Sequence, residues 1–414
     1  MLRVMVRLAD FRWPVCATGS SLAGMTRSAI RLIPLLGAAL ISACDLAENR
    51  APEAWAHLPE PVTNNAVAGL ELDGRLIAYS FAGLHEGKTW RDVTADAYAC
   101  DLDARECREI DGLPDGIGRL ASVAVTLGGQ IYIFGGYTVA EDGSEASTPE
   151  VWRFDPASET YTHITDMPVP VDDSIALPFQ DRYIYLVSGW HDTDNTDLVQ
   201  VYDVEADSWF EATPFPGAPV FGHAGAMDEN GRLMLCGGTA VIPPARESGR
   251  RSFEAQRQCW VGQVMASPAE IAWQAMGDFP SGPFYRGVAI AHPAPLSGYS
   301  FFGGSGNAYN YNGIGYDGDA VEPRGDYVLS VFIPRSRGRD WCTVPHGIEN
   351  TNFLSIRDPW PEGVFMDVRG AVLEGENIAY TLGGMGPGQT VSDHVRRWAL
   401  PVEAVDLPVC GGGE

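Results

Sequence analysis

Short apolar runs, each ending in a pair of small residues, recur along most of the chain. In the clearest copy, residues 130–134 (Gln-Ile-Tyr-Ile-Phe) run directly into Gly135 and Gly136. Apolar runs of this length, rich in β-branched and aromatic residues and bounded by glycine, are typical of strands. The small pair, or a near version of it, ends at Gly83, Gly136, Gly189, Gly238, Gly304 and Gly384. These copies predict six repeats of one β unit.

A second pattern follows several of these pairs: an aspartate with an aromatic residue six positions later. Asp155 leads to Tyr161 and Asp203 leads to Trp209, and both segments then run into an apolar residue and a proline. The pattern predicts two further strands joined by a hairpin, which gives a unit of four strands. The combination resembles the kelch repeat, best over residues 128–168. That resemblance implies that each unit is one blade of a β-propeller.

The spacing of the units predicts how such a propeller closes. Five complete units end near residues 114, 168, 216, 280 and 345, and a sixth, from about 366 to 405, lacks a fourth strand. Residues 54–59 (Ala-Trp-Ala-His-Leu-Pro) look like a fourth strand without the preceding three. Placing them in the last unit hides both free edges. We therefore predict an all-β fold, a six-bladed kelch-type β-propeller closed by an N-terminal strand.

The N-terminal region is predicted to be a leader. Arg27 and Arg31 precede an apolar run over residues 32–43, which is too short to span a bilayer as a helix. The run ends in Leu-Ile-Ser-Ala-Cys, which resembles the lipobox of bacterial lipoproteins and implies acylation of Cys44. An ordinary cleaved signal peptide with an incidental cysteine is the alternative.

These features divide the chain into a leader over residues 1–44 and a single propeller over residues 45–410. Residues 1–24 precede a better start at Met25 and are interpreted as an upstream start-codon artefact. The predicted location is the bacterial cell envelope, where a lipid anchor on the membrane would leave the protein facing the periplasm or the cell surface.

Charge and composition restrict the classes of partner that the protein can bind. Acidic residues outnumber basic ones 54 to 28, which gives a formal net charge of −26. A surface this negative repels phosphate backbones, so no nucleic-acid partner is expected. The 47 glycines and 29 prolines fit many tight turns between short strands.

The cysteines that follow Cys44 are even in number, which is typical of disulfides in an exported protein. Six cysteines allow 15 pairings, and the repeats narrow the choice. Cys100 and Cys107 flank a predicted hairpin between third and fourth strands, and Cys236 and Cys259 fall on adjacent second and third strands. The predicted disulfides are therefore Cys100–Cys107 and Cys236–Cys259. The two cysteines that remain give the third predicted pair, Cys342–Cys410.

The innermost strands of a propeller surround a central channel, and here the starts of those strands are polar. They include Arg119, Asp173, His223, Arg286 and Arg369. If the three arginines converge, they form a positive pocket for an anionic ligand such as an acidic sugar. His223 and Asp173 are then candidates for proton transfer. In the alternative, the arginines pair with neighbouring aspartates and hold the blades together.

The fifth unit carries a long insert that adds candidate ligand-binding residues. Asn310, Tyr311 and Asn312 precede Gly313 in a segment rich in aromatic and amide side chains, which suit sugar binding. The segment resembles bacterial N-acetylneuraminate epimerases, which are exported six-bladed kelch mutarotases. Here the pattern is one residue shorter, and Asp317 stands where that family has a histidine. A glycine- and asparagine-rich surface loop is the alternative.

No motif in the sequence indicates a phosphate loop, a calcium loop or a zinc site, so no cofactor and no metal are predicted. Two functional classes remain. The first is a binding module that holds a glycan or a protein partner outside the cytoplasm. The second is a sialic-acid mutarotase that opens the sugar ring by acid–base catalysis. The kelch resemblance alone does not decide between them.

Overall fold

The computed structural model describes residues 54–242, 252–279, 282–294, 298–324, 328–332, 353–356 and 364–400. All of them belong to one unit, residues 51–414. The predicted leader with Cys44 and the predicted pair Cys342–Cys410 lie outside the described residues. Among the described residues, no helix has the length and apolar character needed to cross a bilayer.

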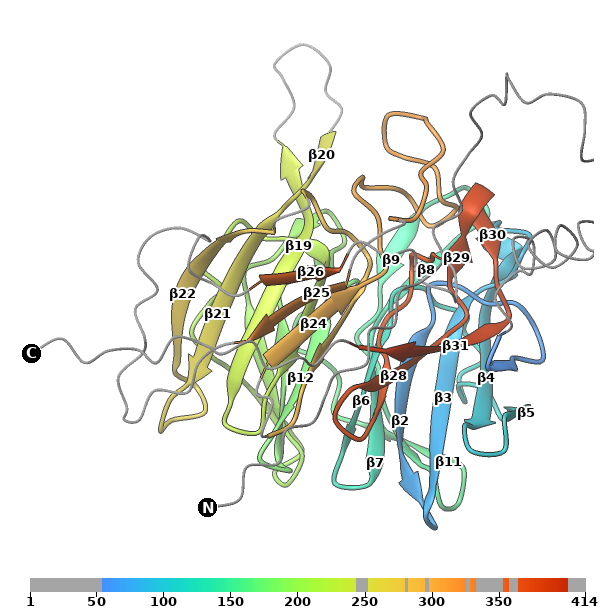
Figure 1. Ribbon diagram of the computed structural model, residues 1–414, viewed down its shortest axis with the longest axis horizontal. Coiled ribbons are helices and arrows are strands. Elements are labelled where there is room, and N and C mark those ends of the chain that lie inside the picture. The colour runs from blue at the N-terminus through green and yellow to red at the C-terminus, as the bar shows by residue number, and fades with distance from the viewer. Residues whose placement is uncertain are drawn as a thin grey trace, which may run out of the picture. The chain divides into compact units, whose positions relative to one another are not determined.

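Within these ranges the long strands form six antiparallel sheets, one for each predicted blade (Figure 1). Blade 1 consists of β2 (Ala66–Leu72), β3 (Arg75–Leu84), β4 (Val93–Asp101) and β5 (Glu106–Ile110). Blade 2 consists of β6 (Val123–Leu127), β7 (Gln130–Phe134), β10 (Val151–Asp155) and β11 (Thr160–Ile164). Blade 3 consists of β12 (Ile175–Phe179), β13 (Tyr183–Val187), β16 (Val199–Asp203) and β17 (Ser208–Glu211).

The remaining blades repeat this order from the innermost strand outward. Blade 4 consists of β18 (Phe221–Met227), β19 (Arg232–Ile242), β21 (Gln258–Val264) and β22 (Ile271–Asp278). Blade 5 consists of β23 (Val288–Ala291), β24 (Gly298–Phe302), β25 (Val328–Phe332) and β26 (Phe353–Ile356). Blade 6 consists of β27 (Val372–Glu374), β28 (Ile378–Leu382), β31 (His394–Ala399) and β1 (Ala56–His57).

Short ribbons gather at one end of the blades, the upper end in Figure 1 for those labelled there. They pair β8 (Tyr137–Val139) with β9 (Glu145–Ser147), β14 (Trp190–His191) with β15 (Asp194–Asn195), β29 (Met385–Gly386) with β30 (Thr390–Val391), and β20 (Ser252–Ala255) with β19. The described residues also contain the 3-10 turns η1 (Trp90–Asp92) and η3 (Pro387–Gln389).

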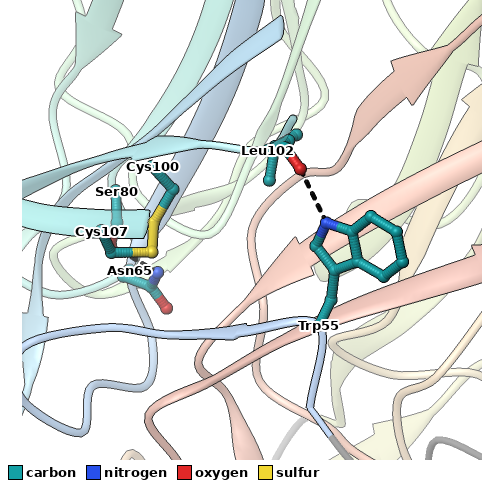
Figure 2. The surroundings of a disulfide bond; sticks show 6 residues. All are labelled: Trp55, Asn65, Ser80, Cys100, Leu102 and Cys107. Carbon is teal, nitrogen blue, oxygen red and sulfur yellow. Dashed lines mark hydrogen bonds between the residues drawn. A yellow bond between two sulfur atoms is a disulfide. The ribbon is translucent and has the colours of Figure 1, made fainter. Parts of the chain in front are cut away.

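The predicted closure by the N-terminal segment is confirmed. In β1, Ala56 lies opposite Val395 of β31, so the strand at the beginning of the propeller completes blade 6. The indole Nε1 of Trp55 donates a hydrogen bond to the Leu102 carbonyl at 2.8 Å, which ties this strand to blade 1 as well (Figure 2). The propeller therefore closes through main-chain pairing and not through packing alone.

The two predicted disulfides that fall within the described residues are present. Cys100 bonds to Cys107 across the β4–β5 hairpin (Figure 2), and Cys236 bonds to Cys259 between β19 and β21. In each case the two cysteines lie directly opposite each other on antiparallel strands. Opposed positions on such strands bring the cysteine backbones within disulfide range.

A closed circle of backbone hydrogen bonds joins the six blades at the channel. It contains one residue from the start of each innermost strand, and each residue donates its N–H to the carbonyl of the residue before it in the circle. The members, which we call the channel ring, are Asn64, Ala121, Asp173, Gly222, Arg286 and Asp367, and the N–H of Asn64 completes the circle on the carbonyl of Asp367. The donor–acceptor distances run from 2.7 to 3.3 Å. All six residues have a positive φ between 50° and 67°.

The glycine pairs lie where one blade meets the start of the next. A Cβ built on Gly237, in the pair of blade 4, would lie 1.9 Å from the carbonyl oxygen of Phe284, just before the channel-ring residue of blade 5. No side chain fits at that distance. The repeated pair therefore marks the contact between blades that the kelch pattern requires.

We predict that Gly237→Ala destabilises the protein far more than Gly143→Ala. Both glycines have a left-handed backbone, with φ of 75° and 79°, but nothing lies within 4 Å of a Cβ at Gly143. Gly143→Ala carries only the backbone cost of about 1 kcal/mol, whereas Gly237→Ala adds the clash and costs about 2–4 kcal/mol. Chemical denaturation of the two variants measures the difference, and equal losses would contradict this account of the pairs.

Candidate functional site

The channel ring separates two cavities. A channel cavity of about 360 Å³ is lined by the innermost strands, on the residues that follow the ring positions, such as Ser174 and Gly287. A mouth pocket of about 80 Å³ lies at the ring residues Asp173 and Arg286 and at the ribbons beyond them. The two cavities share no lining residue, because buried charged side chains fill the ring between them.

Two of the three predicted arginines, Arg286 and Arg369, meet inside the ring and are tied to aspartates. The Nε and Nη2 atoms of Arg286 donate to Oδ2 of Asp173 at 2.9 and 2.6 Å, and Nη2 of Arg369 lies 2.6 Å from Oδ1 of the same carboxylate. Asp367 lies 3.4 Å from each guanidinium group. We call these four residues the Arg–Asp cluster.

The Arg–Asp cluster links blades and leaves little positive charge to offer a ligand. Asp173 belongs to blade 3, Arg286 to blade 5, and Asp367 and Arg369 to blade 6. Burial raises the pKa of Asp367, and the two arginines act in the opposite direction. The guanidinium carbon of Arg286 also lies 5.0 Å from the ring of Tyr285 and 5.2 Å from that of Tyr309. Arg286 and Arg369 therefore follow the alternative prediction, in which the arginines pair with neighbouring aspartates and hold the blades together.

Arg119 does not join them, which corrects the expectation of three converging arginines. Its side chain is 1 % exposed and binds Asp115, with Glu150 at 3.6 Å, between blades 1 and 2. The reason lies in its position. Arg286 is itself a ring residue and Arg369 follows one by two positions, whereas Arg119 precedes the ring residue Ala121 by two. It lines neither cavity.

The two residues predicted to transfer protons line different cavities. His223 lines the channel cavity, while Asp173 lines the mouth pocket. Burial lowers the pKa of His223 to about 4, although Asp173 and the Val187 carbonyl act in the opposite direction. The imidazole is therefore neutral near pH 7. Asp173 is already engaged by two arginines. Neither is a free acid or base at the mouth.

The mouth pocket combines aromatic walls with a polar floor. The walls are Trp190, Phe221, Phe253 and Tyr316. Trp190 and Phe221 have ring centroids 5.5 Å apart, and the rings of Phe253 and Tyr316 are stacked at 4.1 Å. The polar lining consists of Tyr137, Glu145, Asp172, Asp173, Arg286 and Asn310. These residues come from ribbons and loops of several blades, which is why only part of the set was predicted.

Asp172 is a pocket carboxyl that was not predicted from the sequence, where its neighbour Asp173 was the candidate. Its side chain is buried, and its Oδ2 accepts a hydrogen bond from the Ser147 hydroxyl at 2.7 Å. Burial raises the pKa of Asp172 well above its usual value, and the nearby charge of Asp173 adds to the effect. Burial also raises the pKa of Glu145. The sequence shows two adjacent aspartates, Asp172 and Asp173, but it does not reveal which of the two carboxylates pairs with the arginines.

The insert contributes one of its three predicted residues to the pocket. Asn310 lines the mouth pocket. Tyr311 instead packs against an apolar cluster that includes Leu120 and Tyr137. The Oδ1 of Asn312 accepts a hydrogen bond from the backbone N–H of Ile314 at 3.1 Å and so shapes the loop. These contacts assign Tyr311 and Asn312 to holding the insert in place.

Comparison with known proteins agrees with the kelch-type fold. The kelch motif family matches residues 118–168. Kelch-like protein 15 of Gallus gallus is 27% identical over 143 residues, which cover 31% of this chain and 29% of that protein. Kelch-like protein 23 of Homo sapiens is 32% identical over 135 residues, 32% of this chain and 23% of that protein. This chain thus spans less than a third of the length of these relatives.

A solved structure extends the likeness to most of the chain. The structure of YjhT superposes with a TM-score of 0.58 and covers 82% of this chain and 95% of that one, at 14% sequence identity. At this identity the likeness concerns the fold alone. The arrangement of strands is therefore shared with that structure over most of its length.

We predict that Asp172→Asn stabilises the protein at neutral pH. Because burial raises the pKa of Asp172 above the ordinary aspartate value of 3.8, wild-type stability falls as pH rises from that value toward the folded pKa. Asparagine keeps the acceptor for Ser147 and removes the charge. The free energy of unfolding of Asp172→Asn, relative to that of wild type, should therefore increase by up to about 1.4 kcal/mol for each pH unit in that window. Denaturation curves from about pH 4 to about pH 8 measure it.

Asp142→Asn is the matched control, because hydrogen bonds from Ser144 lower the pKa of that exposed carboxyl. Its effect on the pH dependence should have the opposite sign, since the stabilising charge of Asp142 is lost as pH falls. A stability difference for Asp172→Asn that does not change with pH would overturn the assignment of a buried acid.

Proposed function

We propose that this chain is an exported binding module whose mouth pocket takes a neutral, hydroxyl-rich sugar ring of a glycan. One observation carries the proposal: aromatic walls face carboxyl, amide and guanidinium groups within a single small pocket at the channel mouth. The apolar faces of a sugar ring pack on aromatic rings, and its hydroxyls need donors and acceptors at fixed places. The mouth pocket offers both.

The charges of the pocket favour a neutral sugar over an acidic one. The expectation of an acidic sugar depended on free arginines, but Arg286 already shares the Asp173 carboxylate with Arg369. Asp172 and Glu145 add acidic groups beside it. A ligand carboxylate would compete with Asp173 for the guanidinium group and would meet these acids, which costs binding energy. The binding experiment below therefore compares an acidic sugar with neutral ones.

The proposal also includes a location in the bacterial cell envelope, attached to the membrane through lipid on Cys44. Two observations support it. Residues 40–44 have the lipobox pattern, and the Cys100–Cys107 and Cys236–Cys259 disulfides are typical of an oxidising compartment. A glycan partner outside the cytoplasm is consistent with that location.

We predict that the purified protein binds a neutral sugar such as galactose or N-acetylglucosamine more tightly than N-acetylneuraminate in isothermal titration calorimetry. Tyr316→Ala removes an aromatic wall that is 41% exposed, so the fold should tolerate it. The variant should weaken binding about two- to tenfold. The control is Tyr183→Ala, a partly buried tyrosine in β13 outside the pocket.

Two results would contradict the proposal. One is the absence of heat with every sugar tested. The other is equal loss of affinity in Tyr316→Ala and Tyr183→Ala. Tighter binding of N-acetylneuraminate would show that the ligand displaces the Arg–Asp cluster, and would overturn the choice of a neutral sugar.

A second candidate function, sugar mutarotation, is favoured by the two carboxyl groups of raised pKa in the pocket. Ring opening needs a proton delivered to the ring oxygen and another removed from the anomeric hydroxyl, and closure reverses both transfers. Asp172, whose pKa burial raises well above its usual value, fits the donor, and Glu145 fits the acceptor. This assignment replaces His223 and Asp173. The resemblance of the insert to N-acetylneuraminate epimerases gives the same reaction class.

If the chain is a mutarotase, it should accelerate anomeric exchange of a sugar above the uncatalysed rate in an NMR exchange measurement. Asp172→Asn should then lower the rate by about a hundredfold, because asparagine cannot donate the proton. Asp142→Asn changes an exposed carboxyl that does not line the pocket and should leave the rate unchanged. Exchange at the background rate together with measurable sugar binding would remove the catalytic candidate and leave the binding module.

A further inference from the structure

Two histidines face each other where the N-terminal strand completes blade 6. His57 in β1 lies directly opposite His394 in β31, and the side chain of Asp393 reaches toward both. We propose that His57, Asp393 and His394, which we call the seam site, bind a divalent transition-metal ion, zinc in particular. The seam site is independent of the mouth pocket and of any sugar.

The distances suit a single ion. One nitrogen of each histidine and one carboxylate oxygen all lie within 4.8 Å of one another. The Nδ1 of His57 is 2.9 Å from Oδ2 of Asp393, and the Nε2 of His394 is 3.7 Å from Oδ1. Zinc binds nitrogen and oxygen at about 2.0–2.1 Å in a tetrahedron, which puts its ligand atoms about 3.3 Å apart. The two histidines lie beside different oxygens of the same carboxylate, one pair shorter and one longer than that value, and side-chain rotation within the 4.8 Å limit would bring the three ligand atoms onto one ion.

The donor set selects the class of ion. Two imidazole nitrogens and one carboxylate are typical ligands of zinc, copper and nickel, whereas calcium and magnesium prefer oxygen ligands alone. The side chains of His57, Asp393 and His394 are 57%, 36% and 38% exposed. An ion can therefore reach the site, and water can supply the fourth ligand.

One cation, the guanidinium group of Arg396, lies near the seam site, and its charge acts against a bound metal ion. The guanidinium group of Arg396 acts on both Asp393 and His394, but its Nη1 donates to the Gly383 carbonyl at 2.6 Å and its Nη2 to the Ser392 hydroxyl at 2.9 Å. It is thus held by other partners than the Asp393 carboxylate. The formal net charge of −26 attracts cations to the protein as a whole.

A bound ion would connect the two ends of the propeller. His57 and Asp393 are 336 positions apart in sequence, and β1 contributes only two residues to its sheet. Ligands on both strands would resist separation of β1 from β31, the step that opens the ring. Because the ion binds the closed form, its binding free energy adds to the stability of the folded state.

The test uses the purified protein freed of metal with a chelator, at about pH 7.5, because metal binding competes with protons for the ligands. Isothermal titration with zinc sulfate should show one ion bound, and the melting temperature should rise with zinc concentration. His57→Ala and His394→Ala should each weaken binding by about tenfold or more. His163→Ala is the control, since His163 forms a similarly exposed pair with Asp166 at 2.8 Å in another blade.

Separate controls test whether the variants still fold and whether zinc binds elsewhere on the protein. Without zinc, the variants should melt close to wild type, because the replaced side chains are exposed. Cobalt should give the visible absorption of a tetrahedral site in wild type and lose it in the double variant His57→Ala/His394→Ala. Zinc binding by the double variant with wild-type affinity, or a melting temperature that zinc leaves unchanged, would overturn the proposal and leave an ordinary surface ion pair.

Discussion

The closed circle of six backbone hydrogen bonds is the constraint on which the rest of this propeller depends. Each ring residue donates to the blade before it, so no blade can shift without breaking two bonds. The left-handed backbone at all six positions fixes the direction of the side chain at each ring residue other than Gly222. Because Asp173, Arg286 and Asp367 occupy three of these positions, charged groups are forced together in the channel. Their mutual neutralisation makes that burial tolerable.

Features that repeat, or that follow from counting repeats, could be predicted from the sequence. The glycine pairs are required because a carbonyl of the next blade occupies the place of a side chain, as Phe284 does at Gly237. The N-terminal strand of blade 6 followed from one missing strand and one surplus strand. Cys100 and Cys107 could be paired because both lie on the same hairpin. In each case the signal is local or periodic.

The candidate site could be predicted only in part, because its chemistry depends on which side chains of different blades meet. Arg119 and Arg286 look equivalent in sequence, but an offset of two residues from the ring sends Arg119 to Asp115 and Glu150. Asp172 and Asp173 are neighbours in sequence, yet only Asp173 receives the arginines. His57 and His394 lie at opposite ends of the chain, and only the closure of the ring makes them adjacent.

The Arg–Asp cluster also determines how the mouth pocket can act. The mouth pocket and the channel cavity that His223 lines share no lining residue, and members of the cluster line each of them. Arg286 nevertheless belongs to both the cluster and the pocket lining. A ligand that attracts its guanidinium group weakens the hold on Asp173, and the greater negative charge there favours a protonated Asp172. Ligand polarity and the protonation of the pocket are therefore coupled through one pair of adjacent carboxyl groups.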